Sequence, residues 1–225
     1  MGVALAARNL SSGYNGVPVI REVDLEVCHG EMVLLGGPNG AGKTTTVMTL
    51  AGGISPLTGQ VEVDGSSTRL PLFRRTRSGL GLITEQRTVF ASLTVAENVR
   101  VSRAKMEDVL RYFPELEKRI KVKAGLISGG EQQMLSVGRV LAAKPQVVLA
   151  DELSLGLAPI IVKRLLAALR TAADDGAAVL VVEQHVRAAL EYCTRGYFLR
   201  RGRIELHGLR DELRDNEDAI QQLYL

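Results

Sequence analysis

The chain has 225 residues, of which 46% are hydrophobic and 24% charged, a balance typical of one globular domain. Its net charge of +3 is small and its basic residues are scattered, which argues against a nucleic-acid partner. The two cysteines, Cys28 and Cys193, lie in apolar segments away from any Cys/His cluster, so the sequence predicts neither a disulfide framework nor a zinc site.

Membrane-directed segments are not evident in the sequence. The chain begins Met1-Gly2-Val3-Ala4, without the basic region and apolar run of a signal peptide. No stretch approaches the roughly 18 apolar residues of a membrane-spanning helix. We therefore expect a cytoplasmic protein whose link to a membrane runs through a partner.

Strand and helix patterns alternate along the chain. Alternating apolar residues predict half-buried strands, and short continuous apolar runs predict buried ones. In chain order the sequence predicts strands at 23–27 and 32–35, a helix at 43–51, a strand at 60–63, helices at 105–112, 114–121 and 129–143, a strand at 147–150, a helix at 159–173, a strand at 177–182 and a helix in the tail at 209–225.

This alternation predicts an α/β fold with a mostly parallel sheet covered by helices on both faces. The charged, helix-prone middle of the chain, about residues 91–143, is expected to be a helical subdomain inserted into a RecA-like core. We expect residues 1–225 to form a single domain of the phosphate-loop NTPase class, with an antiparallel N-terminal β subdomain.

A phosphate-binding loop is the clearest motif. Residues 37–44 match G-x-x-x-x-G-K-[ST] in full, between a predicted strand and a predicted helix, as the motif requires. Its glycines let successive N–H groups point at phosphate oxygens, and the helix N-terminus adds a favourable dipole. The alternative, a glycine-rich turn that only connects a strand to a helix, does not require the full pattern. The expected ATP-binding residues are Gly37, Pro38, Asn39, Gly40, Ala41, Gly42, Lys43, Thr44 and Thr45.

Charged and hydroxyl groups at this loop have separate expected roles. Lys43 would neutralise the outer phosphates of ATP, and the Thr44 hydroxyl would ligate Mg²⁺. Asp151 and Glu152 directly follow the predicted strand 147–150, and such strand ends border the ligand site of an open α/β sheet. We expect Asp151 to hold Mg²⁺ and Glu152 to act as general base toward water. Without the phosphate loop, two acidic residues at a strand exit would equally suggest a solvent-exposed turn.

Residues 127–133, Ile-Ser-Gly-Gly-Glu-Gln-Gln, resemble the signature motif of ATP-binding-cassette (ABC) ATPases, usually L-S-G-G-Q. Ser128, Gly129 and Gly130 open a helix, so they offer a hydroxyl and free N–H groups to an anion. The resemblance implies that this anion is the γ-phosphate of an ATP held by a second subunit, with two ATP molecules sandwiched between two chains. Glu131 replaces the usual glutamine of the signature, and we expect it to belong to the same ATP-binding segment. An ordinary Ser-capped helix is the simpler alternative.

The resemblance to ABC ATPases covers essentially the whole chain. It implies that Tyr14 stacks on adenine and that Glu85 occupies the glutamine position of the Q-loop, where a carboxylate can reach Mg²⁺ or its water. Gln86 is the adjacent alternative to Glu85. Residues 154–157 match the D-loop, and Leu153 stands where the family normally has proline, which could loosen the turn that aims the preceding glutamate.

The switch region of this family falls at residues 183–185, after the last buried strand. Aligned from that strand, Gln184 takes the position where most relatives carry histidine, and His185 follows it. Either side chain could contact the γ-phosphate, and the register slightly favours Gln184. A histidine at a strand exit is more often structural than catalytic.

Two longer segments, residues 128–135 and 154–161, look like the ATPase subunits of bacterial branched-chain amino-acid importers. This closer resemblance implies an ATP- and Mg²⁺-dependent subunit on the cytoplasmic face of a membrane. Its expected partners are a second ABC ATPase subunit, identical or different, transmembrane permeases and, indirectly, a solute-binding protein.

Three alternatives remain open from the sequence. A cassette subunit could serve another solute, such as urea or short amides. A non-transport cassette protein acting on ribosomes or DNA ends would normally have two cassettes or a long coiled-coil insertion, and neither is found here. A phosphate-loop kinase would have no use for the signature motif.

Overall fold

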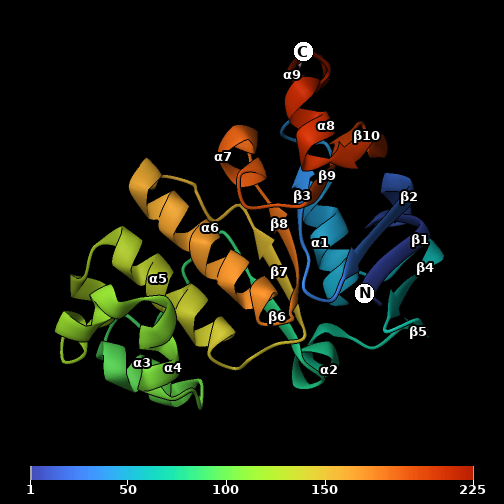
Figure 1. The fold of residues 1–225 in the computed structure, drawn as a ribbon. Helices are drawn as coiled ribbons and strands as arrows, with labels where there is room; N and C mark the ends of the chain where they lie inside the picture. The colour runs from blue at the N-terminus through green and yellow to red at the C-terminus, as the bar shows by residue number, and fades with distance from the viewer. Residues whose placement is uncertain (1, 225) are drawn as a thin grey trace.

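Two β-sheets form the framework of the computed structural model, which describes residues 2–224 (Figure 1). The larger sheet has the strand order β10-β9-β3-β8-β7-β6, and all its neighbouring strands are parallel except β10 and β9. The smaller sheet is antiparallel, with the order β2-β1-β4-β5. The strands are β1 (Val3–Tyr14), β2 (Val17–Cys28), β3 (Met32–Gly36), β4 (Thr58–Val63), β5 (Ser66–Thr68), β6 (Leu80–Ile83), β7 (Val147–Asp151), β8 (Ala178–Val182), β9 (Arg195–Arg200) and β10 (Arg203–Leu209).

The central strands are apolar because both faces of the larger sheet are covered. Every residue of β3, β7 and β8 is buried. In β3, Met32 and Leu34 pack into a core shared with helices α5, α6 and α7, whereas Val33 and Leu35 pack with α1 and the smaller sheet. The predicted α/β fold, with a mostly parallel sheet and an antiparallel subdomain, is confirmed.

Helices lie on both sides of the larger sheet, and α3, α4 and α5 gather beyond α6, away from α1 (Figure 1). This helical region falls within residues 91–143, whose identity as a separate inserted subdomain stays a prediction. The helices are α1 (Lys43–Ala51), α2 (Leu72–Arg77), α3 (Val95–Val101), α4 (Met106–Tyr112), α5 (Gly129–Leu141), α6 (Pro159–Asp174), α7 (Val186–Leu190), α8 (Arg210–Asp215) and α9 (Glu217–Leu223).

Two sequence predictions about helices are wrong. Residues Pro114–Arg119 form a 3₁₀ helix rather than the first part of an α-helix at 114–121, and the amide of Ile120 bonds three residues back to Glu117. The predicted tail helix is two short helices, because Asn216 has φ −113° and ψ 41°, outside the helical region. Leu209 is the last residue of β10. Met1 and Leu225, included in the predictions for the two termini, lie outside the described residues.

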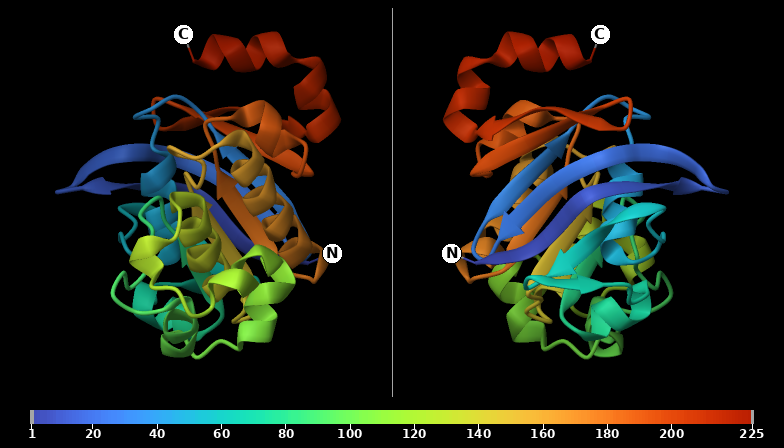
Figure 2. Two further views of the ribbon diagram at one scale, coloured as in Figure 1. Left: turned by 90° about the vertical axis from the view of Figure 1, so that its left-hand side faces the viewer. Right: turned by 90° about the vertical axis from the view of Figure 1, so that its right-hand side faces the viewer.

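The C-terminal part of the chain supports the loop between β3 and α1. The Tyr224 hydroxyl accepts a hydrogen bond from the Gly37 amide at 2.9 Å, and the Gly202 amide donates to the Ala41 carbonyl at 3.1 Å. Figure 2 shows α8 and α9, in red, at the top of both views. Residues distant in sequence therefore hold both ends of the loop.

The β9–β10 hairpin reaches this loop through a two-residue turn. Arg201 and Gly202 have φ angles of 49° and 81°, the pattern of a type I′ turn. The Gly202 carbonyl also accepts a hydrogen bond from the Arg21 amide at 2.8 Å. A Cβ at position 202 would lie 2.2 Å from the carbonyl oxygen of Val19, so only glycine permits this approach to β2.

Gly202→Ala should lower the free energy of unfolding by more than Gly65→Ala does. Both positions have positive φ, 81° and 73°, so each substitution carries backbone strain of roughly 1–2 kcal/mol. A Cβ at Gly65 meets no atom within 4 Å, which makes this variant the matched control for the contact with Val19. Urea unfolding measures both losses. Equal losses would contradict the close packing of the hairpin on β2.

Candidate active site

The loop of residues 37–42 connects β3 to α1 and depends on glycine at several positions. Gly37, Gly40 and Gly42 have φ angles of 138°, 77° and 106°, which other residues rarely adopt. A Cβ at Gly37 would lie 2.2 Å from the Leu199 carbonyl oxygen, and one at Gly42 would lie 2.5 Å from the Ile20 side chain. A Cβ at Gly40 meets nothing within 4 Å, so at this position glycine is favoured by the backbone angle and not by close packing.

Lys43, the first residue of α1, lies across this loop. Its side chain is 4% exposed, and its Nζ donates hydrogen bonds to the carbonyls of Gly37 at 2.9 Å and Pro38 at 3.1 Å. The same Nζ lies 3.5 Å from Oε1 of Glu152. The ammonium is therefore fixed between the loop and the acidic pair, where phosphate oxygens can bind it.

Glu152 has an unusual backbone conformation that aims its carboxylate at this lysine. Its φ is +49°, which is uncommon for a residue other than glycine. The Glu152 amide donates to the Val182 carbonyl at 3.0 Å, and its Oε2 accepts a hydrogen bond from Nε2 of Gln184 at 2.9 Å. One oxygen of the carboxylate thus contacts Lys43 and the other Gln184.

Asp151 fits a Mg²⁺ ligand by its position and chemistry. It ends β7, is buried, and its Oδ1 has no hydrogen-bond partner in the described part of the chain. Burial raises the pKa of this carboxyl, while a hydrogen bond with Thr44 and the charge of Lys43 oppose the shift. A buried carboxylate oxygen without a partner beside a hydroxyl suits a hard cation, which would also offset the cost of burying the charge.

No group of three or more Asp, Glu, His or Cys side chains in residues 2–224 could hold a metal ion. A site that takes Mg²⁺ through one or two protein oxygens and substrate phosphates needs no such group. Glu85, the third residue predicted to be near the metal, follows β6 and is exposed, yet its charge contributes to the raised pKa of Asp151. The binding of Mg²⁺ by Thr44, Glu85 and Asp151 stays a prediction.

The segment that carries Glu85 is tied to the signature helix α5. Thr88 shares a hydrogen bond with Ser136 at 2.9 Å, and Arg139 donates to the Thr88 carbonyl at 2.8 Å. Glu85 and Gln86 line a hollow of about 370 Å³ together with side chains of the D-loop. A movement of this segment would therefore displace α5 or break these hydrogen bonds.

The two switch candidates lie in different surroundings. Both side chains are exposed and line one apolar cavity with the C-terminal helix, but only Gln184 donates a hydrogen bond to Glu152 in the described part of the chain. The structure thus places Gln184, and not His185, in contact with the Glu152 carboxylate. The role of either residue in catalysis stays a prediction.

The signature serine caps α5 through a reciprocal pair of hydrogen bonds. The Ser128 hydroxyl accepts from the Glu131 amide at 3.3 Å, and Oε2 of Glu131 accepts from the Ser128 amide at 2.8 Å. The Ser128 amide is therefore occupied within the cap, and the binding of an anion by this segment stays a prediction. The Gly129 and Gly130 amides lie in the first helical turn, where no intrahelical acceptor exists.

The glutamate at position 131 also completes an ion pair. Its Oε1 accepts a hydrogen bond from Nε of Arg119 at 2.8 Å. Burial alone would raise the pKa of Glu131, but the bonds from Arg119 and Ser128 bring it below its ordinary value. The carboxylate thus fixes the serine as a glutamine side chain would, and adds an ion pair.

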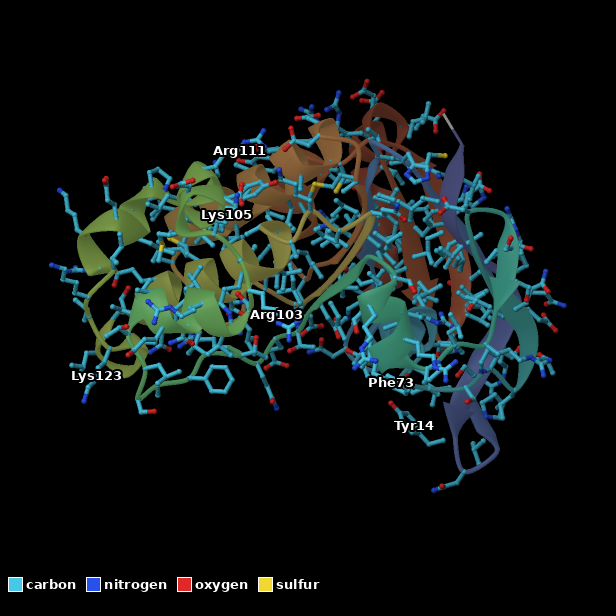
Figure 3. The ribbon with its side chains drawn as sticks, turned by 90° about the horizontal axis from the view of Figure 1, so that it is seen from below. Tyr14, Phe73, Arg103, Lys105, Arg111 and Lys123 are labelled. Carbon is cyan, nitrogen blue, oxygen red and sulfur yellow. The ribbon has the colours of Figure 1, made fainter. Side chains whose placement is uncertain are left out.

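Tyr14 lies at the outer end of the β1–β2 ribbon, next to the two-residue turn Asn15-Gly16 (Figure 3). Its side chain is 54% exposed. An exposed ring at the end of a rigid hairpin suits stacking on a planar base. The Tyr14 ring is therefore accessible to a ligand, and its contact with adenine stays a prediction.

Two residues that hold the phosphate loop, Gly202 and Tyr224, were missed from the sequence. The Arg-Gly pair between two short apolar segments is a hairpin signal that could have found Gly202. No local pattern indicates the contact of Tyr224, since it is made across the fold. Glu183 falls in the predicted switch region, but its burial and its bond to Ser154 were not predicted.

Comparisons with known proteins agree on one family. The family model described as ABC transporter matches residues 20–154. A high-affinity branched-chain amino acid transport ATP-binding protein, BraG of Pseudomonas aeruginosa, is 38% identical and covers 90% of this chain and 91% of its own. The lipopolysaccharide export system ATP-binding protein LptB of Escherichia coli is 34% identical and covers 98% and 96%. The dimeric structure of a bacterial ABC transporter cassette superposes with a TM-score of 0.79 at 25% identity, covering 92% of this chain and 98% of that one.

Gln184→Ala should strongly reduce the turnover of ATP, whereas His185→Ala should have a mild effect. Gln184 donates to Glu152 through a neutral amide, and His185 makes no such contact. Measuring turnover of both variants from mildly acidic to mildly basic pH tests this assignment, because an imidazole ordinarily titrates in that range and an amide does not. A severe loss in His185→Ala with little loss in Gln184→Ala would reverse it. Near-parental turnover in both variants would exclude both residues from the switch role.

Proposed function

Because this chain belongs to the ABC transporter family and hydrolyses ATP, we propose that it is the nucleotide-binding subunit of an importer of branched-chain or other hydrophobic amino acids. The observation that supports amino acids as the transported solute is the 38% identity to BraG over 90% of the chain. The similarity to LptB, an export protein, makes the direction of transport the part that most needs a test.

The geometry supports hydrolysis with Glu152 as general base. Glu152 takes a proton from water as the oxygen attacks the γ-phosphorus, and the bond to the β–γ bridging oxygen breaks to give ADP and phosphate. Lys43 neutralises charge on the phosphates, and Gln184 holds the carboxylate in place. Thr44, Asp151 and Glu85 are the proposed ligands of Mg²⁺ or its water. The ion, when bound, neutralises the phosphates and fixes their orientation.

Two chains are needed for a complete site in this proposal. In Figure 1, α1, which follows the phosphate loop, lies on one side of α6. The helices α3, α4 and α5 lie on the other side, and the signature residues are at the start of α5. The signature residues Ser128, Gly129 and Gly130 would therefore meet an ATP held by a second cassette subunit. The dimeric cassette of similar fold supports this arrangement.

Exposed apolar side chains mark the surface that the second subunit would cover. Leu126, Leu155 and Ile160 are 77%, 55% and 73% exposed, just before the signature, in the D-loop and at the start of α6. A Cβ at Gly130 would contact the Ile161 side chain at 3.1 Å, so the signature and the start of α6 are adjacent. Exposed large apolar side chains at these three segments are consistent with burial against a second subunit.

In residues 2–224 no helix is long and apolar enough to cross a bilayer. We propose that the subunit lies at the cytoplasmic face of the membrane and is held there by permease subunits. A solute-binding protein would deliver the amino acid to those permeases from the other side. This assembly requires no nucleic acid.

Glu152→Gln should nearly abolish ATP turnover while ATP binding persists, and should trap an ATP-bound dimer. The amide cannot accept the proton, but its oxygen can still accept the hydrogen bond from Gln184, and Asp151 is untouched. Phosphate release and size-exclusion chromatography with and without ATP measure the two effects. A variant that turns over at the parental rate would remove Glu152 from the base role.

Deleting the gene from its own cells should abolish high-affinity uptake of labelled leucine, isoleucine and valine. A plasmid copy of the parental chain should restore uptake, and the matched Glu152→Gln copy should not. Loss of urea or short-amide uptake instead would assign a different solute. Intact uptake of all these solutes with a defect in the cell envelope would place the chain in an exporter.

A further inference from the structure

Glu183 is a buried carboxylate to which the chemistry above gives no role. It follows the last residue of β8 and is 1% exposed. Its Oε2 accepts a hydrogen bond from the Ser154 hydroxyl at 2.5 Å, and its Oε1 has no partner within residues 2–224. Burying an ionisable group costs stability unless its polar atoms are paired, so this carboxylate needs a reason to be there.

The two ends of this hydrogen bond lie on either side of Glu152. Ser154 is two residues after Glu152 in the D-loop, and Glu183 directly precedes Gln184, which contacts the Glu152 carboxylate. The Glu152 amide itself bonds to Val182, the residue before Glu183. The segment 152–154 is thus joined to the segment 182–184 by three hydrogen bonds: one from the Glu152 amide, one to the Glu152 carboxylate and one from the Ser154 hydroxyl.

A constraint of this kind is needed because the backbone of Glu152 is strained. Its φ of +49° costs of the order of 1–3 kcal/mol and persists only where surrounding contacts enforce it. Leu153, which is 2% exposed, brings no ring to restrict the backbone of this turn. The short, buried hydrogen bond to Glu183 restricts the turn from the next residue instead.

We infer that Glu183 is a positioning residue for ATP hydrolysis, which acts with Ser154 to hold Glu152 in its left-handed conformation against Lys43 and Gln184. The inference rests on the proposed role of Glu152 as general base. The bond also joins the D-loop, which the proposed dimer places against the second subunit, to the switch segment. Contact with the second subunit can therefore reach the catalytic carboxylate through Ser154. The simpler alternative is that the bond only closes the end of β8.

Four variants of the full chain, assembled with its partners, separate these cases. Ser154→Ala and Glu183→Ala should each lower kcat roughly tenfold, a change of about 1.4 kcal/mol in the barrier, with the KM for ATP within about twofold of the parental value. The double variant should be no slower than either single one, because both remove the same bond. Glu183→Gln should recover most of the rate, since an amide oxygen can accept the Ser154 hydroxyl.

Thr171→Ala is the matched control, because it removes an exposed hydroxyl that bonds only to the Ala167 carbonyl within α6. It should leave kcat unchanged. Thermal melting verifies that each variant is folded, and Ser154→Ala carries the test if Glu183→Ala does not fold. A parental kcat in folded Ser154→Ala, or a lower melting temperature as its only effect, would overturn the inference.

Glu152→Gln measured alongside tells the two hypotheses apart. An inactive Glu152→Gln with a normal Ser154→Ala would remove the positioning role and leave the base role standing. A fully active Glu152→Gln would remove the base role itself, and with it the basis of the inference.

Discussion

The parallel pairing of β3, β8 and β7 is the constraint on which the active site depends. Leu35 pairs with Val182, and Val182 pairs with Asp151, so the carboxyl ends of three strands lie side by side. The loops that leave these ends carry the lysine, the acidic pair and the switch residue. Since every residue of the three strands is buried, a shift of one position would move apolar side chains between the two cores and is strongly disfavoured.

Charges near this edge are brought together at a cost to stability that other contacts offset. Lys43 and Glu152 partly neutralise each other, and burial raises the pKa of Asp151. Burial, reinforced by the charge of Glu152, also raises the pKa of Glu183 to about 7, although the hydrogen bond from Ser154 opposes the shift. The phosphate loop is held from outside the sheet by Tyr224 and Gly202. Rigid support of a strained, charged site is what preorganised electrostatic catalysis requires.

Most of the fold could be predicted from the sequence, because buried strands and the phosphate loop have local patterns. The prediction failed at two places where the periodicity does not fix the backbone: the tail helix is interrupted at Asn216, and residues 114–119 form a 3₁₀ helix. The site was predicted through its motifs, but a motif does not reveal that Glu131 occupies the Ser128 amide or that Gln184 faces Glu152. These contacts depend on the side-chain geometry of the folded chain.

In the proposed dimer, one chain holds only half of each ATP site. Lys43→Ala disables the phosphate loop and leaves the signature intact, and Ser128→Arg disables the signature and leaves the loop intact. Each variant alone should be inactive, whereas a mixture in equal amounts should regain activity, up to about a quarter of the parental sites by random pairing. A mixture as inactive as its components, although mixed dimers are shown to form, would contradict a site shared between two chains.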